Sequence, residues 1–228
     1  MSADDEKRLC GEAAAELAQP GTVVGLGTGS TAVWFVRALA ARRLPIVCVP
    51  TSEATAALAR ELGLALTNLD EAGAIDLTVD GADEIGPGLA LIKGGGGALL
   101  REKLVWEASA RCVCIADAGK VVPMLGAFAL PIEVAAFGHK TTAARVCDVL
   151  AEFDIGMAPR LRLRDGQPFR TDGGNLIYDA ACGRIEEPAA VAAALKSVTG
   201  VVDHGLFLDL ADLALIGLDG GGVKTLEP

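Results

Sequence analysis

The stretch Val23-Val-Gly-Leu-Gly-Thr-Gly-Ser-Thr31 joins a short apolar run to a glycine-rich break, and a helical pattern follows it. Similar runs of Val, Ile and Leu recur through the first half of the chain, each followed by a Gly or polar break and then by a helical pattern. This order is typical of an α/β fold, in which helices cover both faces of a parallel sheet. We therefore predict strands at 23–26, 46–49, 75–79, 89–92 and 112–116, and helices at 4–17, 32–42, 52–62 and 99–108, with Ser52 as the N-cap of the third helix.

The pattern changes after Pro123. Strand-like segments at 130–134, 160–163 and 175–179 alternate with turn-rich segments and with helical patterns at 139–153 and 188–196. This mixture predicts a smaller α+β domain over about 128–200. The apolar run Leu213-Ala-Leu-Ile-Gly217 is expected to return to the first sheet, so the larger domain would comprise 1–127 plus 201–228.

Composition and charge exclude several classes of function. The 228 residues include 20 Lys+Arg and 30 Asp+Glu, and the net charge of −10 argues against binding nucleic acids or anionic membranes through bulk charge. The acidic start and the lack of a long apolar run predict a cytoplasmic protein without a membrane segment. Six cysteines without C-x-x-C spacing are expected in the core, and neither His139 nor His204 has metal-ligand spacing, so no metal site is expected.

Glycines, lysines and aspartates follow the ends of four predicted strands. The four segments are Gly27-Thr-Gly-Ser-Thr31, Asp80-Gly-Ala-Asp83, Lys93-Gly-Gly-Gly-Gly97 and Asp117-Ala-Gly-Lys120. In an open parallel sheet the carboxyl ends of the strands face one crevice, where ligands bind. Turn chemistry explains any one segment alone, but the four together favour a shared binding site.

The first segment has the composition of a phosphate-binding loop. Gly27 and Gly29 let backbone N–H groups approach an anion, and Thr28, Ser30 and Thr31 add hydroxyl groups at the start of a helix. A dinucleotide fingerprint does not fit because Ser30 stands where its last Gly is required, and the G-K-[ST] of a Walker loop is absent. A glycine-rich turn with an ordinary N-cap remains the alternative.

The other segments supply charged candidates. Asp80 and Asp83 are suited to binding a metal, to holding sugar hydroxyls or to acid–base catalysis, or are turn and cap residues. Lys93 is suited to stabilising an oxyanion, or is a solvated lysine. Glu102 follows the glycines by about one helical turn, where burial would raise its pKa and make it a base, or it is a surface residue paired with a basic neighbour.

The ordered combination of motifs resembles the ribose-5-phosphate isomerases of the A type. The motifs are 20–31, 79–85, 92–98, 101–103, 130–134, 171–175 and 222–225, which together span essentially the whole chain. The resemblance implies interconversion of D-ribose 5-phosphate and D-ribulose 5-phosphate in the pentose phosphate pathway. It also implies a Rossmann-like catalytic domain, a smaller ferredoxin-like α+β domain, no metal or other cofactor, and a cytosolic homodimer or homotetramer.

The resemblance further implies roles for individual residues. Glu102 would move a proton between C1 and C2 through an enediolate, Lys93 would stabilise the enediolate oxygen, and Asp80 and Asp83 would hold sugar hydroxyls and assist ring opening. Lys120 and Lys7 would assist the phosphate loop. The expected substrate-binding residues are Thr28, Gly29, Ser30, Thr31, Gly81, Ala82, Gly94, Gly95, Gly96, Lys120 and Lys7.

Two alternatives from other classes stay open at the level of sequence. A phosphosugar-binding regulatory domain would share such a crevice without turnover, although no helix-turn-helix segment precedes the first strand. A CoA-transferase-like enzyme would instead use a glutamate nucleophile, for which Glu102 is the candidate.

Overall fold

The computed structural model describes residues 2–228 and divides the chain into two compact units. The first unit comprises Met1–Ala82, Arg101–Val121 and Asp209–Pro228, and the second comprises Asp83–Leu100 and Val122–Leu208. The division places residues 83–100 in the second unit, whereas the sequence pattern predicted that unit over about 128–200. Among the described residues no helix is long and apolar enough to cross a membrane.

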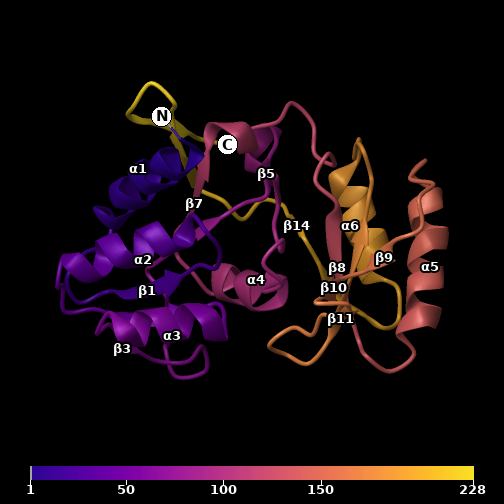
Figure 1. Ribbon diagram of the computed structural model, residues 1–228, viewed down its shortest axis with the longest axis horizontal. Coiled ribbons are helices and arrows are strands. Elements are labelled where there is room, and N and C mark those ends of the chain that lie inside the picture. Colours follow the sequence, from indigo (N-terminus) through magenta and orange to yellow (C-terminus); the bar gives the residue numbers. More distant parts are fainter. Residues whose placement is uncertain (1) are drawn as a thin grey trace. The chain divides into compact units, whose positions relative to one another are not determined.

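A seven-stranded sheet forms the centre of the first unit (Figure 1). The strand order is β16-β15-β7-β4-β1-β2-β3, and all neighbours are parallel except β15 and β16. The predicted α/β fold is therefore confirmed, as is the return of residues 213–217 to the first sheet beside β7. The strands are β1 (Val23–Leu26), β2 (Val47–Pro50), β3 (Ala65–Leu66), β4 (Leu77–Gly81), β7 (Cys112–Asp117), β15 (Leu213–Gly217) and β16 (Val223–Leu226).

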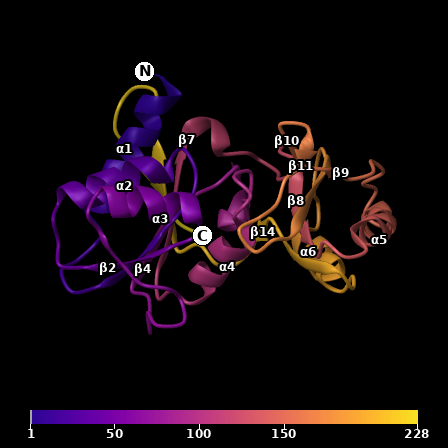
Figure 2. The same ribbon diagram turned by 60° about the horizontal axis from the view of Figure 1, so that its bottom comes forward.

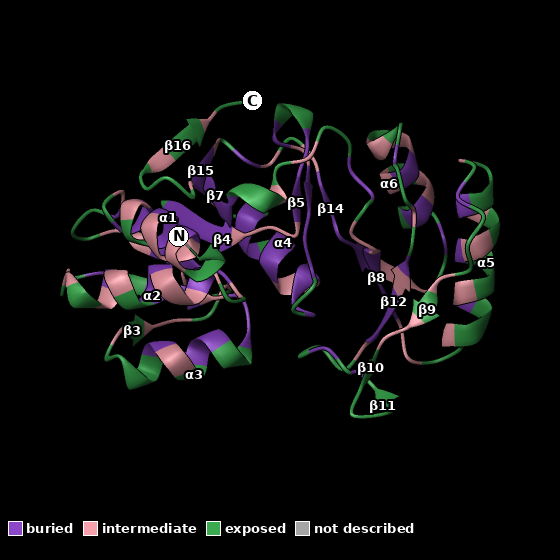
Figure 3. Cartoon of the chain, turned by 45° about the horizontal axis from the view of Figure 1, so that its top comes forward, coloured by how far each residue is buried: buried purple, intermediate pink, exposed green. Residues whose placement is uncertain are grey.

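Helices cover both faces of this sheet because its strands are apolar on both sides. Val24 and Leu26 belong to a core cluster with apolar residues of α1, α2 and α3, whereas Val23 lies in a separate cluster with Val105 of α4. The central strands β4 and β7 are accordingly buried (Figure 3). Ser52 accepts a hydrogen bond from the N–H of Thr55 (3.1 Å), which confirms it as an N-cap. The helices are α1 (Ala3–Ala15), α2 (Ala32–Ala41), α3 (Glu53–Glu61) and α4 (Leu99–Glu107), and a 3-10 turn, η2 (Ala118–Lys120), follows β7.

The second unit contains a four-stranded antiparallel sheet in the order β13-β8-β12-β9. Helices α5 and α6 pack against it, with Val146 and Leu150 of α5 and Leu195 of α6 in one cluster with the apolar residues of β8 and β12 (Figure 2). A hairpin, β10-β11, and a three-stranded sheet, β14-β6-β5, complete the unit. The elements are β5 (Glu84–Ile85), η1 (Pro87–Leu89), β6 (Leu91–Ile92), β8 (Leu130–Val134), α5 (His139–Ala151), β9 (Arg160–Leu161), β10 (Leu163–Arg164), β11 (Gln167–Pro168), β12 (Leu176–Ala180), α6 (Pro188–Lys196), β13 (Val201–His204) and β14 (Leu206–Phe207).

One predicted strand belongs to a different sheet from the one expected. The segment 89–92 was predicted to join the parallel sheet, but only Leu91–Ile92 is a strand, and it pairs antiparallel with β5 and β14. The turn between β5 and β6 reverses the chain, with positive φ angles at Gly88 (64°) and Leu89 (54°). The expectation that four parallel strand ends converge is therefore wrong for the segment that begins at Lys93, and it holds for β1, β4 and β7, which are neighbours in one sheet.

Candidate functional site

The loop after β1 is anchored by a cluster of hydroxyl groups. The Thr28 hydroxyl lies 2.7 Å from that of Thr51, 2.8 Å from that of Ser52 and 3.2 Å from that of Thr55. Thr55 also donates to the carbonyl oxygen of Gly27 (2.9 Å). Thr28 donates to Ser52 in this cluster, and the short contacts among the hydroxyl groups tie the loop to the start of α3. Further along the loop, residues 29 and 30 are exposed and residue 31 is half-buried.

Asp80, at the end of β4, holds the same loop from the neighbouring strand. Its side chain is fully buried, and Oδ1 accepts hydrogen bonds from the backbone N–H groups of Thr28 (2.9 Å) and Gly81 (2.7 Å). Gly27 packs directly on it, since a Cβ at this position would lie 2.2 Å from Oδ1 and 2.5 Å from the Cα of Asp80. Asp80 therefore fixes the geometry of the predicted phosphate loop, a contact that sequence reasoning did not foresee.

Helix α1 brings side chains to two of the predicted loops. Lys7 donates from Nζ to the Ser30 hydroxyl (3.1 Å), so it lies beside the loop after β1. Glu6 is buried, and its Oε2 accepts the backbone N–H of Ala118 (3.0 Å) at the start of the turn that carries Lys120. Sequence reasoning missed Glu6 because an acidic residue in the first turn of a helix is ordinary there.

Lys93 is buried in the second unit. Its side chain is 2% exposed and its Nζ lies 5.3 Å from the centre of the Phe207 ring, at cation–π distance. The backbone N–H of Lys93 donates to the carbonyl of Gly205 (2.9 Å), which fixes the chain where β6 ends. The alternative of a solvated lysine is therefore wrong.

The four glycines after Lys93 form a tight loop whose tip is open to solvent. Gly94 and Gly97 are buried, have positive φ angles (101° and 86°) and are joined by a hydrogen bond from the N–H of Gly97 to the carbonyl of Gly94 (3.0 Å). Gly95 and Gly96 are exposed between them. Asp83 accepts the N–H of Gly95 on Oδ2 (2.7 Å), so this predicted site residue is part of the loop's structure.

Glu102 lies on α4, and its side chain is 3% exposed. The alternative of an exposed helix residue paired with a neighbour is therefore wrong. The division between the units falls between Leu100 and Arg101, within the first turn of the same helix. The predicted site residues of the first unit are Lys7, Thr28, Gly29, Ser30, Thr31, Asp80, Gly81, Ala82, Glu102 and Lys120, and those of the second are Asp83, Lys93, Gly94, Gly95 and Gly96.

A second buried carboxylate, Glu133 on β8, was not foreseen as a functional candidate. It is 1% exposed, and Oε1 accepts hydrogen bonds from the Thr171 hydroxyl (2.9 Å) and the Asn175 amide (2.9 Å). Burial raises the pKa of Glu133, the two hydrogen bonds counteract that rise, and the negative charge of Asp203 adds to it. The spacing of 130–134 and 171–175 in the sequence gave no sign that these motifs meet.

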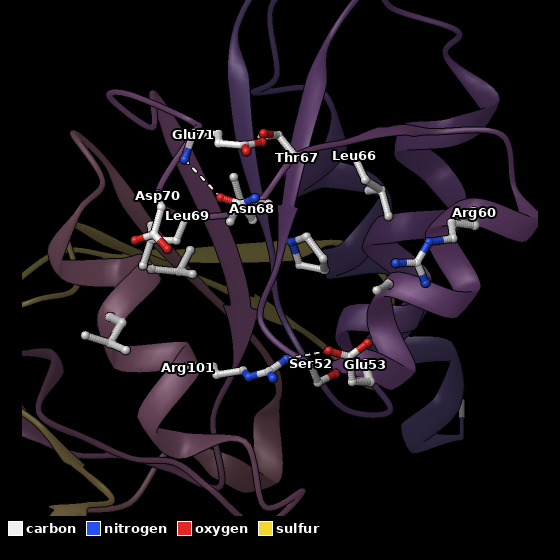
Figure 4. Close-up of a pocket in the computed structure, with 15 residues that line it drawn as sticks. Ser52, Glu53, Arg60, Leu66, Thr67, Asn68, Leu69, Asp70, Glu71 and Arg101 are labelled. Atoms are coloured by element: carbon white, nitrogen blue, oxygen red, sulfur yellow. Dashed lines mark hydrogen bonds and ion pairs between the residues drawn. The ribbon is translucent and has the colours of Figure 1, made fainter. Parts of the chain in front are cut away.

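A pocket of about 720 Å³ opens in the first unit beside the ends of β2 and β3 (Figure 4). Its walls come from the start of α3, the loop 67–71 and the outer face of α4, and an ion pair between Arg101 and Glu53 (2.9 Å) lies at one side. None of the predicted site residues lines this pocket. Within residues 2–228, no group of three or more His, Cys, Asp or Glu side chains is arranged to hold a metal ion.

Comparison with known proteins identifies one family. The family pattern described as "Ribose 5-phosphate isomerase A (phosphoriboisomerase A)" matches residues 47–221. The chain is 71% identical to the ribose-5-phosphate isomerase A of Caulobacter sp. (strain K31), over 99% of this chain and 100% of that protein. The structure of ribose 5-phosphate isomerase from Plasmodium falciparum matches with a TM-score of 0.92 at 37% identity, over 99% of both chains. A D-ribose-5-phosphate isomerase solved in complex with phospho-erythronic acid matches with a TM-score of 0.92 at 35% identity, over 100% of both chains.

Proposed function

The chain belongs to the ribose 5-phosphate isomerase A family, whose members interconvert ribose 5-phosphate and ribulose 5-phosphate, and we propose that its reaction proceeds by proton transfer through an enediolate with Glu102 as the base. Aldose-to-ketose conversion removes a proton from C2 and delivers one to C1, which requires one group that accepts and returns a proton. The observation that carries the proposal is the burial of the Glu102 carboxylate on a helix that begins directly after the glycine loop.

Lys93 is proposed to stabilise the oxygen that becomes negative as the enediolate forms. A buried ammonium group is suited to this role because its charge is poorly screened by water and needs little reorganisation during the reaction. Asp80 and Asp83 are proposed to hold sugar hydroxyls and to assist ring opening. Both also accept backbone N–H groups of the glycine loops, so they would fix the loops and contact the sugar at the same time.

The phosphate is proposed to bind the loop after β1. The exposed residues Gly29 and Ser30 lie at the start of α2, and Lys7 contacts the Ser30 hydroxyl. Lys120 is proposed to add a second cation. An acidic chain that binds a phosphate must place its cations locally, and these two lysines supply such a placement.

The ligand of a relative supports an enediolate intermediate. Phospho-erythronic acid, bound to an isomerase 35% identical to this chain, carries a carboxylate in addition to its phosphate. A carboxylate spreads negative charge over two oxygen atoms, as an enediolate does, and sites complementary to an intermediate bind such compounds tightly. Neither a regulatory domain without turnover nor a CoA-transferase is favoured by a match that extends over the whole chain.

The test is the variant Glu102→Gln, which keeps the shape of the side chain and removes the base. We expect kcat for ribose 5-phosphate to fall at least about 100-fold with KM nearly unchanged. The matched control is Glu107→Gln on the exposed side of the same helix, which should retain wild-type turnover. Wild-type kcat in Glu102→Gln would show that another group moves the proton.

We propose that this proton transfer needs no metal, because Lys93 supplies the positive charge. Protein treated with EDTA should isomerise ribose 5-phosphate at the untreated rate. Activity that appears only after a divalent metal is restored would contradict this proposal.

We also propose that the chain acts as a homodimer or homotetramer in the cytoplasm. Several large apolar side chains are exposed on the described chain, among them Phe137, which is 98% exposed, and Met124. Light scattering coupled to size-exclusion chromatography measures the molar mass directly, and a value near 23.3 kDa would contradict assembly. Fractionation of the source cells tests the location.

A further inference from the structure

Arg162 binds the glycine loop of the second unit through its side chain. The guanidinium group donates from Nη1 to the carbonyl oxygens of Gly94 (2.8 Å) and Gly95 (3.1 Å). Its other edge binds the Asp179 carboxylate through Nε (2.9 Å) and Nη2. The side chain of Arg162 is 15% exposed. Arg162, which lies between β9 and β10, thus makes two hydrogen bonds to consecutive peptide groups of the loop and two to Asp179 on β12.

The backbone of Arg162 is fixed as well as its side chain. Its N–H donates to the carbonyl of Ile177 (2.8 Å), and its carbonyl accepts the N–H of Phe169 (2.9 Å). The Phe169 ring packs against the loop, since a Cβ on Gly97 would lie 2.4 Å from it. The arginine is thus attached to a rigid support, and the loop is held at Gly94, Gly95 and Gly97.

The orientation of the two peptide groups follows from their planarity. All described peptide bonds are trans, so the N–H of each peptide group points opposite to its carbonyl. The peptide group between Gly94 and Gly95 has this orientation: its carbonyl accepts a hydrogen bond from Arg162, and its N–H donates to Asp83. The next peptide group also directs its carbonyl to Arg162, so the N–H of Gly96 points away from the arginine at the exposed tip of the loop.

We propose that Arg162, oriented by Asp179, is a positioning residue that turns the N–H groups of Gly95 and Gly96 away from itself, so that the Gly96 N–H donates to an oxygen of the bound sugar. This inference rests on the proposed function and on the expectation that Gly94, Gly95 and Gly96 bind the substrate. Arg162 does not touch the substrate, and it acts by binding the carbonyl side of the peptide groups whose opposite side carries the donors. A lysine cannot replace it fully, since an ammonium group lacks the planar fork that serves both Asp179 and the carbonyls.

The experiment compares Arg162→Met, Arg162→Lys and Asp179→Asn with wild type in kcat, KM and hydrogen exchange. We expect Arg162→Met to lose about 10- to 100-fold in kcat, as for a weakened oxyanion donor, with a smaller change in KM. Arg162→Lys and Asp179→Asn should fall between this variant and wild type. The amide protons of Gly95 and Gly97 should exchange faster in all three variants, while amides of the α5 helix keep their protection.

Arg170→Met is the matched control. Arg170 also donates to a glycine carbonyl of the second unit, that of Gly174 (3.0 Å), but it does not contact the loop, so this variant should keep wild-type kcat. Wild-type kcat in folded Arg162→Met, or an equal loss in Arg170→Met, would overturn the proposal. If Arg162→Met does not fold, the same measurements on Arg162→Lys and Asp179→Asn test the proposal: wild-type kcat in both would overturn it. Full activity of Glu102→Gln would refute the proposed base instead, and the exchange measurement would still test the contact of Arg162 with the loop.

Discussion

Asp80 offers a sharp test because its carboxylate has two proposed roles, and inhibition by inorganic phosphate depends on only one of them. Oδ1 accepts the N–H of Thr28 in the proposed phosphate loop and the N–H of Gly81, and the same carboxylate is proposed to hold sugar hydroxyls. If Asp80 only held the sugar, its charge would not matter for inorganic phosphate, which has no sugar hydroxyls. If Asp80 fixes the loop, the affinity for inorganic phosphate depends on it.

The magnitude follows from the two amide contacts. A hydrogen bond to a charged acceptor contributes about 1.5–3 kcal/mol and one to a neutral acceptor about 0.5–1.5 kcal/mol, so Asp80→Asn loses about 1 kcal/mol per contact while keeping the oxygen. Loosening the loop by about 1–2 kcal/mol corresponds to a 5- to 30-fold weaker affinity for phosphate. The buried position of Asp80 keeps water from replacing the lost interaction.

The assay is competitive inhibition of ribose 5-phosphate isomerisation by inorganic phosphate, measured in wild type, Asp80→Asn and Asp83→Asn. Asp83 is the matched control because the backbone N–H that it accepts, that of Gly95, belongs to the glycine loop of the second unit. The inhibition constant should rise in Asp80→Asn and stay at the wild-type value in Asp83→Asn. An inhibition constant for phosphate that is unchanged in folded Asp80→Asn would refute the anchoring role.

Two further predictions concern buried groups. Burial raises the pKa of Glu133 in the folded protein above the pKa that it has in the unfolded chain. The protonated carboxyl therefore stabilises the folded state at a pH below the unfolded-state pKa, and this stabilisation is lost as the pH rises through the folded-state pKa. Urea unfolding should therefore show Glu133→Gln gaining stability relative to wild type as the pH rises above about 4, the ordinary range of a glutamate carboxyl, and a difference independent of pH would contradict this. Burial also raises the pKa of Cys10 to about 11 and that of Cys48 to about 12, so neither thiol should react with Ellman's reagent at pH 8 until urea unfolds the protein, which peptide mapping can verify.

The sequence predicted the parallel sheet well because its signal is local. Buried strands such as β4 and β7 are short apolar runs, and the hydroxyl and glycine residues that begin each helix stand directly beside them. The apolar run of β15 was also sufficient to return the chain to the first sheet. Its partner β7 lies far away in the sequence, and both strands are apolar enough to be buried.

The sequence misplaced the segment before Lys93 because apolar residues alone do not distinguish a parallel from an antiparallel strand. The residues of β6 are buried like those of the main sheet, and the turn at Gly88 decides the direction of pairing. Glu133 and Arg162 were missed for another reason. Their partners, Thr171 and Gly94, are separated from them in sequence by 38 and 68 positions, so no spacing rule brings them together.

The division of the chain into two compact units has a consequence for modularity. The chain crosses from one unit to the other four times, at 82/83, 100/101, 121/122 and 208/209. Excising residues 122–208 would leave β5 and β6 behind without β14, and excising 83–100 would remove Lys93 together with the glycine loop. Neither unit could therefore be exchanged between homologues as one continuous segment. Shuffling between homologues should succeed only when the segments 83–100 and 122–208 come from the same parent.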